Sequence, residues 1–296
     1  IWTVGAAVLF FIKKPAPPAH LKYPAEENVK TAPRLKPGMA RPELTARSAL
    51  SVFADGVGRP QTLFEKNSRE RLPIASVAKL MTTLVVLEIF SPEDTVTFSK
   101  TAITEKESFG EFAAGESFSA GELIHSLLME SSNDAAAAFA EAVGREKFVG
   151  IMNAAAGKIG LNNTWFSNPT GLDAGDDGGE PSHATAEDVL EMARYIKENR
   201  PEIFSILAAA EYDLRDTGGR FHHKIKNTDE LLSRRDWGIK IIGGKTGETP
   251  VARQALLLIV ESPRGSGYIA SVILKSEDRF GDMKTLVDWD YNSYVW

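Results

Sequence analysis

The sequence contains no cysteine among its 296 residues. This absence excludes a thiol nucleophile, a thiolate zinc site and any disulfide, but cysteine-free proteins occur on both sides of a membrane, so the compartment stays open. An excess of positive charge is also missing, because 34 Lys and Arg residues stand against 40 Asp and Glu residues, a formal net charge of -6. A chain without a basic field does not attract a phosphate backbone, so we expect no nucleic-acid partner.

Histidine is scarce as well, with five residues in the whole chain. No two of them stand at the spacing by which one helix binds a metal ion, so we predict no metal and no cofactor. We interpret the adjacent pair His222 and His223 as polar residues of a strand or loop. The histidines are His20, His125, His183, His222 and His223.

The first 45 residues contain two segments of different composition. Residues 1–12 are apolar apart from Thr3, lack a starting methionine, and are shorter than the roughly 20 apolar residues of a membrane helix, so we interpret them as a truncated hydrophobic anchor or signal segment, or else a buried strand. Residues 13–45 hold seven of the fifteen prolines and show no apolar periodicity, which predicts an extended linker. We expect one folded domain over 46–296, because 43% hydrophobic residues suffice for a large core.

Hydrophobic patterns in this domain predict strands at both ends and helices between them. Residues 49–54 and 62–65 have the pattern of a β-hairpin, and 238–245, 254–261 and 268–275 are rich in Ile, Val and Leu. Helices are expected over 76–90, 146–159, 186–198 and 279–291, together with one capped by Ser119 and one, capped by Asn133 or Asp134, that stops at Gly144. This order favours an α+β fold in which N- and C-terminal strands form one sheet beside a mainly helical middle.

Ser76 and Lys79 are the first candidates for chemistry. Three positions apart on a helix, their side chains lie on one face within reach of each other. A serine hydroxyl needs a neighbour that takes its proton, and burial would disfavour the charged form of the lysine. The first turn of a helix also offers backbone N–H groups to a developing oxyanion. By itself this short pattern is also that of an ordinary helix start.

Two further short motifs carry polar side chains to predicted element ends. Ser131 and Asn133 flank a link between two helices, where side chains can project into a cleft, although serine and asparagine are also ordinary capping residues. Lys245, Thr246 and Gly247 end a predicted strand and place a cation, a hydroxyl and a residue that allows close backbone approach at a sheet edge.

In chain order, these Ser-x-x-Lys, Ser-x-Asn and Lys-Thr-Gly motifs resemble the active-site motifs of penicillin-binding proteins and serine β-lactamases. Four stretches narrow the resemblance to low-molecular-weight D-alanyl-D-alanine carboxypeptidases: PIASVAKLMT at 73–82, SNDAA at 132–136, NPTGLD at 168–173 and GKTGETP at 244–250. The resemblance covers about 50–289. It implies a β-lactamase/DD-peptidase-like fold with an antiparallel sheet, and a hydrolase that removes the terminal D-alanine from peptidoglycan stem peptides.

The same resemblance implies roles for individual residues. Ser76 would attack the carbonyl of the penultimate D-alanine, Lys79 would act as base, and Ser131 would relay a proton. Asn133 would bind the substrate amide and orient Lys79.

The predicted substrate-binding residues lie at the C-terminal motif. Lys245 would supply positive potential, Thr246 would hold the substrate carboxylate, and Gly247 would allow close approach. The backbone N–H of Glu248, with that of Ser76, would form the oxyanion hole, and Arg279 is placed like a carboxylate-binding arginine of some members.

Implied partners and location follow from the family as well. We expect stem peptides and β-lactam inhibitors as ligands, and an extracytoplasmic location, in the periplasm or at the cell surface, with the segment 1–12 as membrane anchor. No second β domain is expected after Trp296, so anchoring would come from the N-terminus.

Departures from the family pattern leave alternatives open. Relatives often carry an Ala-Gly pair where this chain has Ala252 and Arg253, and Glu248 places an acid beside the substrate. A DD-endopeptidase would use the same acyl-enzyme. A serine β-lactamase would need a glutamate that activates the deacylating water, and 160–185 offers only Glu180. A non-catalytic penicillin-binding sensor would not need an activated nucleophile.

Overall fold

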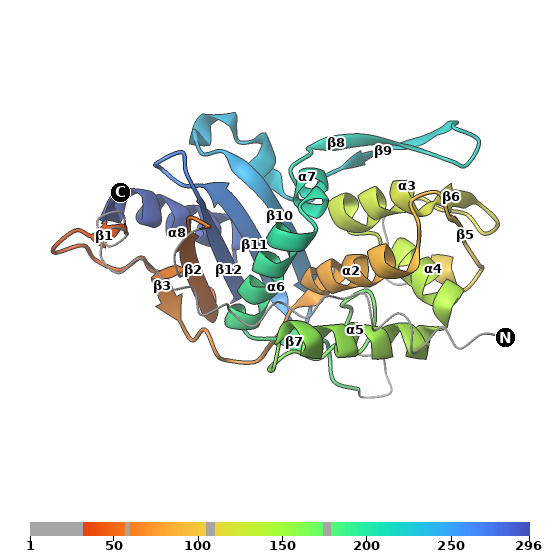
Figure 1. Ribbon diagram of the computed structural model, residues 1–296, viewed down its shortest axis with the longest axis horizontal. Helices are drawn as coiled ribbons and strands as arrows, with labels where there is room; N and C mark the ends of the chain where they lie inside the picture. The colour runs from red at the N-terminus through yellow and green to blue at the C-terminus, as the bar shows by residue number, and fades with distance from the viewer. Residues whose placement is uncertain (1–31, 57–59, 105–109, 174–178) are drawn as a thin grey trace.

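The computed structural model describes residues 32–56, 60–104, 110–173 and 179–296, shown in colour in Figure 1. The apolar segment 1–12 and the linker up to residue 31 lie outside these residues. Within the described part, no helix combines the length and the apolar character needed to cross a membrane.

A five-stranded antiparallel sheet forms one half of the molecule (Figure 1). Its order is β10-β11-β12-β2-β3, so the central contact joins β12 to β2 and unites the two ends of the chain, as predicted. The strands are β2 (Ser48–Ala54), β3 (Gln61–Lys66), β10 (Ile241–Thr249), β11 (Arg253–Glu261) and β12 (Tyr268–Ser276). Strand β10 is an edge strand, which leaves one of its sides open toward the helical half.

The two faces of the sheet are covered by different helices. The C-terminal helix α8 (Arg279–Ser293) contacts β11 and β12, and its Met283, Leu286 and Val287 join a buried cluster with side chains of the sheet. Helix α6 (Ala186–Asn199) contacts β12 and β2. Helices on both faces bury the apolar side chains of every central strand, which fits the α+β prediction.

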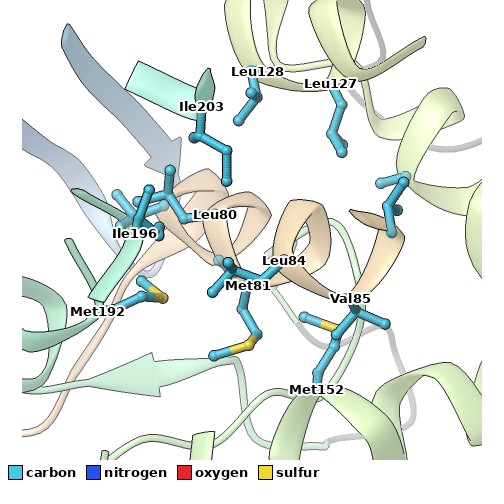
Figure 2. Packing of buried hydrophobic residues seen from close by; sticks show 14 of the residues in the cluster. Leu80, Met81, Leu84, Val85, Leu127, Leu128, Met152, Met192, Ile196 and Ile203 are labelled. Carbon is cyan, nitrogen blue, oxygen red and sulfur yellow. The ribbon is translucent and has the colours of Figure 1, made fainter. Parts of the chain in front are cut away.

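Helix α2 lies at the centre of the helical half (Figure 1). The predicted helix 76–90 forms as a 3₁₀ turn, η3 (Ala75–Ala78), followed by α2 (Lys79–Ile89). Figure 2 shows Leu80, Met81, Leu84 and Val85 of α2 amid buried side chains of the surrounding elements. Because apolar residues surround α2, its polar first residue is held in a fixed place.

The remaining predicted helices form with small corrections. Helix α3 (Ala120–His125) is capped by Ser119 and continues into a π-helical turn, η5 (Ser126–Glu130). Ser132 caps α4 (Asn133–Val143), so the prediction of Asn133 or Asp134 as cap was wrong: the Ser132 hydroxyl accepts the Ala135 N–H at 3.1 Å. Helix α5 (Arg145–Ile159) ends at Ile159 as predicted, with Gly160 as its C-cap.

Short elements complete the chain. Strands β8 and β9 form a hairpin that carries His222 and His223. The short elements are β1 (Arg34–Leu35), β4 (Leu72–Pro73), β5 (Thr95–Thr97), η4 (Ala102–Thr104), β6 (Ser117–Ser119), β7 (His183–Ala184), α7 (Glu202–Leu207), β8 (Glu211–Arg215), β9 (Phe221–Lys226), η6 (Glu230–Ser233), η7 (Arg235–Trp237) and β13 (Tyr294–Val295).

The described part of the predicted linker contacts the folded domain. Strand β1 pairs with β13 near the C-terminus, and Leu44 is buried against the cluster under α8. The Gln61 side chain donates to the carbonyl oxygen of Pro33 at 2.8 Å. Residues 33–45 therefore pack against the domain that the sequence assigned to 46–296.

Asp290 is a fully buried carboxyl group between α8 and the sheet. Its Oδ2 accepts the Ser51 hydroxyl at 2.5 Å, and its Oδ1 has no hydrogen-bond partner among the described residues. Burial raises the pKa of Asp290 from its ordinary 3.8 to about 8, against the lowering effect of the Ser51 hydrogen bond. The folded protein therefore holds a proton here that the unfolded chain loses.

The pH dependence of stability follows from this proton. Because the folded state binds more protons than the unfolded state between the two pKa values, the contribution of Asp290 to stability is present below the unfolded value and is lost as pH rises toward the folded value. We expect the Asp290→Asn variant not to show this loss. Its free energy of unfolding should therefore increase relative to that of the wild type as pH rises, by at most about 1.4 kcal/mol per pH unit. Urea unfolding at several pH values measures the difference. Asp288→Asn on the same helix is the control, and a flat difference curve for Asp290→Asn would contradict the expectation.

Candidate active site

A pocket of about 740 Å³ opens between the edge strand β10 and the helical half. The 3₁₀ turn η3, which carries Ser76, contacts β10 directly. Residues of all three sequence motifs line the pocket. The lining residues are Ser76, Ser131, Asn133, Leu172, Thr228, Thr246, Gly247, Glu248, Thr249, Pro250, Arg253, Gln254, Ser276, Glu277 and Arg279.

Ser76 and Lys79 face each other at the start of α2. Lys79 Nζ donates to Ser76 Oγ at 2.8 Å, and the lysine side chain is fully buried while Ser76 is half-buried. Ala75 precedes the serine with φ +48°, a left-handed conformation that costs energy for a residue with a side chain. Gly171 packs against this turn so closely that a Cβ there would lie 2.0 Å from the Ala75 carbonyl oxygen. The turn before the nucleophile candidate is therefore fixed from outside.

Lys79 is held by two more oxygen atoms from distant parts of the chain. Its Nζ donates to Asn133 Oδ1 and to the carbonyl oxygen of Thr170, each at 2.7 Å. A neutral amine has two N–H donors and one lone pair. It can therefore keep both carbonyl oxygens as acceptors and still accept the proton of the Ser76 hydroxyl, which is the arrangement that a general base needs.

Ser131 and Lys245 form a second buried pair. Ser131 ends the π-helical turn with φ 63°, and it accepts a hydrogen bond from Lys245 Nζ at 2.9 Å. Burial lowers the pKa of Lys245 to about 7, the Arg279 guanidinium acts in the same direction, and the Asp229 carboxylate opposes both. This cation can therefore lose its charge near neutral pH, and an anionic ligand beside it would favour the charged form.

The Lys-Thr-Gly motif lies inside β10 and not at a strand end, so that part of the prediction was wrong, whereas its place at a sheet edge was right. Thr246 Oγ1 lies 2.6 Å from Thr228 Oγ1. A Cβ on Gly247 would lie 3.0 Å from the Ser76 nitrogen and 2.9 Å from the Ile74 carbonyl oxygen. The glycine therefore lets β10 approach the nucleophile turn closely.

Arg279 also reaches the pocket. It opens α8 and its side chain is 15% exposed; Nη1 donates to Glu248 Oε2 at 2.6 Å and lies 3.5 Å from the carbonyl oxygen of Gly247. The exposed acid at position 248 is thus paired with this guanidinium. All nine candidate residues named from the sequence meet at the pocket or directly behind it.

Several residues at the site carried no assigned role in the sequence analysis, among them Thr170, Thr228 and Asp229. Thr170 contributes only its backbone oxygen, although the stretch 168–173 that contains it was part of the family resemblance. The Asn168 side chain accepts the N–H groups of Thr170 and Gly171 at 3.1 and 2.7 Å and so shapes that loop. Thr228 and Asp229 lie in a stretch without any sequence signal. Burial raises the pKa of Asp229 to about 6 although the cations Arg279 and Lys245 lower it.

The structure also shows where Glu180 lies, the residue considered as the activating glutamate of a serine β-lactamase. Glu180 is exposed and is absent from the described pocket lining, and the loop that precedes it, 174–178, lies outside the described residues. Among the residues that the structure describes, no group of three or more His, Asp or Glu side chains is arranged to hold a metal ion.

Comparison with known proteins places this geometry in a family. Residues 36–277 match the family model described as D-alanyl-D-alanine carboxypeptidase. D-alanyl-D-alanine carboxypeptidase DacC of Escherichia coli is 28% identical over 270 residues, which cover 86% of this chain but only 63% of that enzyme, so the chain spans less than two thirds of the length of this relative. A D-alanyl-D-alanine endopeptidase of Pseudomonas aeruginosa is 30% identical over 237 residues, 78% of this chain and 72% of that protein.

Solved structures show the same fold. Penicillin-binding protein D2 of Listeria monocytogenes, in its ampicillin-bound form, matches with a TM-score of 0.69 and 25% sequence identity. The match covers 86% of this chain and 100% of that one. The sheet and the helical half described above are therefore the architecture of penicillin-binding proteins.

Proposed function

The chain belongs to the D-alanyl-D-alanine carboxypeptidase family of peptidases, and from this premise we propose that it is a serine-type carboxypeptidase that removes the terminal D-alanine of peptidoglycan stem peptides through an acyl-enzyme on Ser76. One observation carries the proposal: Lys79 Nζ lies 2.8 Å from Ser76 Oγ and is held there by Asn133 and Thr170. A buried amine in this position has a serine hydroxyl as its reacting partner.

The proposed acylation step moves one proton and exchanges one bond. The Ser76 hydroxyl proton passes to neutral Lys79, and Oγ attacks the carbonyl carbon of the penultimate D-alanine. The oxyanion is bound by the backbone N–H groups of Ser76 and Glu248. When the C–N bond breaks, Lys79 returns this proton through Ser131 to the nitrogen of the leaving D-alanine, so that Lys79 is neutral again. The products are free D-alanine and an ester on Ser76.

Deacylation reverses the proton path with water as the nucleophile. Water gives a proton to Lys79 and attacks the ester carbonyl, and Ser76 regains its proton as the bond to Oγ breaks. The shortened peptide leaves with a new carboxylate.

Substrate binding in this proposal uses the charged end of the same pocket. Lys245, Thr246 and Arg279 receive the terminal carboxylate, and the Asn133 side chain binds the amide of the substrate. Glu248, bonded to Arg279 at 2.6 Å, balances this guanidinium before substrate binds. Because the carboxylate arrives at a group of cations in a buried site, it is held more strongly than it would be in water.

The remaining features of the protein are proposed from the family and the sequence. We place the enzyme outside the cytoplasm, where stem peptides are, with residues 1–12 as anchor and β-lactams as inhibitors. An endopeptidase remains the second candidate, because one relative carries that name and both activities share the acyl-enzyme. A serine β-lactamase would differ by hydrolysing penicillin rapidly, and a non-catalytic penicillin-binding sensor by cleaving no peptide.

The test follows the acyl-enzyme and its products. The protein is incubated with benzylpenicillin and its intact mass is measured, and D-alanine release from a stem pentapeptide is assayed separately. We expect a stable adduct and release of D-alanine. Rapid loss of penicillin without an adduct would favour a β-lactamase, an adduct with cleavage only of cross-linked dimers an endopeptidase, and an adduct without any peptide turnover a sensor.

A further inference from the structure

The pocket extends beyond the atoms that a terminal D-alanine would occupy. Ser76, Ser131, Asn133 and Thr246 share its lining with a second group, Arg253, Gln254, Ser276 and Glu277, which lies at the start of β11 and the end of β12. This second group is available to another part of the ligand. In the proposed reaction this part is the remainder of the stem peptide, so the inference rests on the proposed function.

Arg253 occupies a backbone conformation that favours glycine. It begins β11 with φ +54°, in the left-handed region. A residue with a side chain is strained in this conformation, whereas glycine adopts it freely. An arginine that is kept at an unfavourable φ and lines the pocket points to a role for its side chain.

The Arg253 side chain is paired and still accessible. Position 253 lies opposite Thr249 in the β10–β11 register, directly after the Lys-Thr-Gly-Glu stretch. Its Nη1 donates to both carboxylate oxygens of Glu277, and the two side chains are 50% and 61% exposed. A guanidinium has five N–H donors, and the bonds to Glu277 use one nitrogen, so the pair presents a positive and a negative group side by side.

We propose that Arg253 and Glu277 form a subsite for a group that carries an ammonium and a carboxylate on one carbon, as at the free end of a diamino dicarboxylic acid in the stem peptide. Arg253 binds the carboxylate and Glu277 binds the ammonium. A ligand with a single charge would separate the pair and leave one partner without its counter-ion, whereas a ligand with both charges pairs each of them. The subsite thus selects stem peptides of this type over peptides whose side chain ends in an amine alone.

Two pentapeptides that differ only in this side-chain end test the subsite. One carries an amino-acid head group and the other a lysine side chain at the third position. Their Kd values are measured by calorimetry on the Ser76→Ala variant, so the readout does not depend on turnover, and kcat/KM for D-alanine release is measured on the active protein. We expect a preference of about tenfold for the head group, equivalent to about 1.4 kcal/mol, in both measurements.

Arg253→Gly is expected to reduce this preference to less than about threefold in both measurements, which is about 0.6 kcal/mol. Thermal unfolding distinguishes the lost side chain from a damaged fold, because glycine relieves the strain at φ +54° and should raise the melting temperature. Lys275→Gly is the matched control, since Lys275 has φ 55° and does not line the described pocket. It should raise the melting temperature and leave the preference unchanged.

The outcomes separate this inference from the proposed function. Equal Kd values for the two peptides, or a preference that survives Arg253→Gly, would overturn the subsite even if D-alanine is released. A preference in Kd that Arg253→Gly removes, without D-alanine release by the active protein, would support the subsite and reject the carboxypeptidase.

Discussion

Ser76→Ala is expected to abolish the penicillin adduct and to lower D-alanine release by at least about 1,000-fold, the usual loss when a serine nucleophile is removed. The reason is chemical: Ser76 Oγ is the atom that Lys79 Nζ contacts at 2.8 Å, and no bond to the substrate can form without it. The fold should change little, because Ser76 is half-buried and the substitution deletes one oxygen.

Intact mass and D-alanine release measure both effects, and the melting temperature shows whether the fold is kept. Ser205→Ala, at an exposed position of α7, is the control and should retain adduct and turnover. An adduct that forms on Ser76→Ala as fast as on the wild type would mean that another residue is the nucleophile.

Lys79→Met is expected to slow acylation by about 100- to 10,000-fold, the range typical of general acid–base catalysis. Methionine has a similar length but provides neither a lone pair for the Ser76 proton nor donors for Asn133 Oδ1 and Thr170 O. Two buried oxygen atoms then lose this donor, which costs about 1–3 kcal/mol each in stability. The variant should therefore be both slow and less stable.

The pH profile distinguishes a base from a structural cation. If Lys79 is the base, the acylation rate of the wild type falls at acidic pH. The slow residual acylation by Lys79→Met should not show this fall. Stopped-flow acylation with a chromogenic β-lactam gives the rates, and circular dichroism confirms that the variant is folded. Lys100→Met, at an exposed position, should keep the wild-type profile. An unchanged acidic limb in Lys79→Met would assign the proton transfer to another group.

Local patterns predicted most of the elements and one essential contact. The spacing of Ser76 and Lys79 brings their side chains together because residues three apart share a helix face, and the structure shows this pair at 2.8 Å. The cap at Ser119 and the end of α5 at Ile159 were also confirmed, since helix ends depend on neighbouring residues.

Two predictions from local sequence patterns were wrong. Ser132 rather than Asn133 caps α4, which leaves the Asn133 side chain for Lys79 across 54 positions of sequence. The strand β10 runs past Lys245 to Thr249, because pairing with β11 extends it beyond its apolar residues. In the first case the partner of the Asn133 side chain is distant along the chain, and in the second the next strand, β11, sets where β10 ends.

The sequence by itself determined the motifs, the order of the elements and the α+β class, because periodicity, caps and i to i+3 spacing act over a few residues. Only the tertiary structure decided that Thr170 lends its carbonyl oxygen to Lys79, that Lys245 donates to Ser131 and that Arg279 pairs with Glu248. These contacts join residues 91, 114 and 31 positions apart. Such contacts form only when the core packs and brings distant segments of the chain together, and no short stretch of sequence contains both partners.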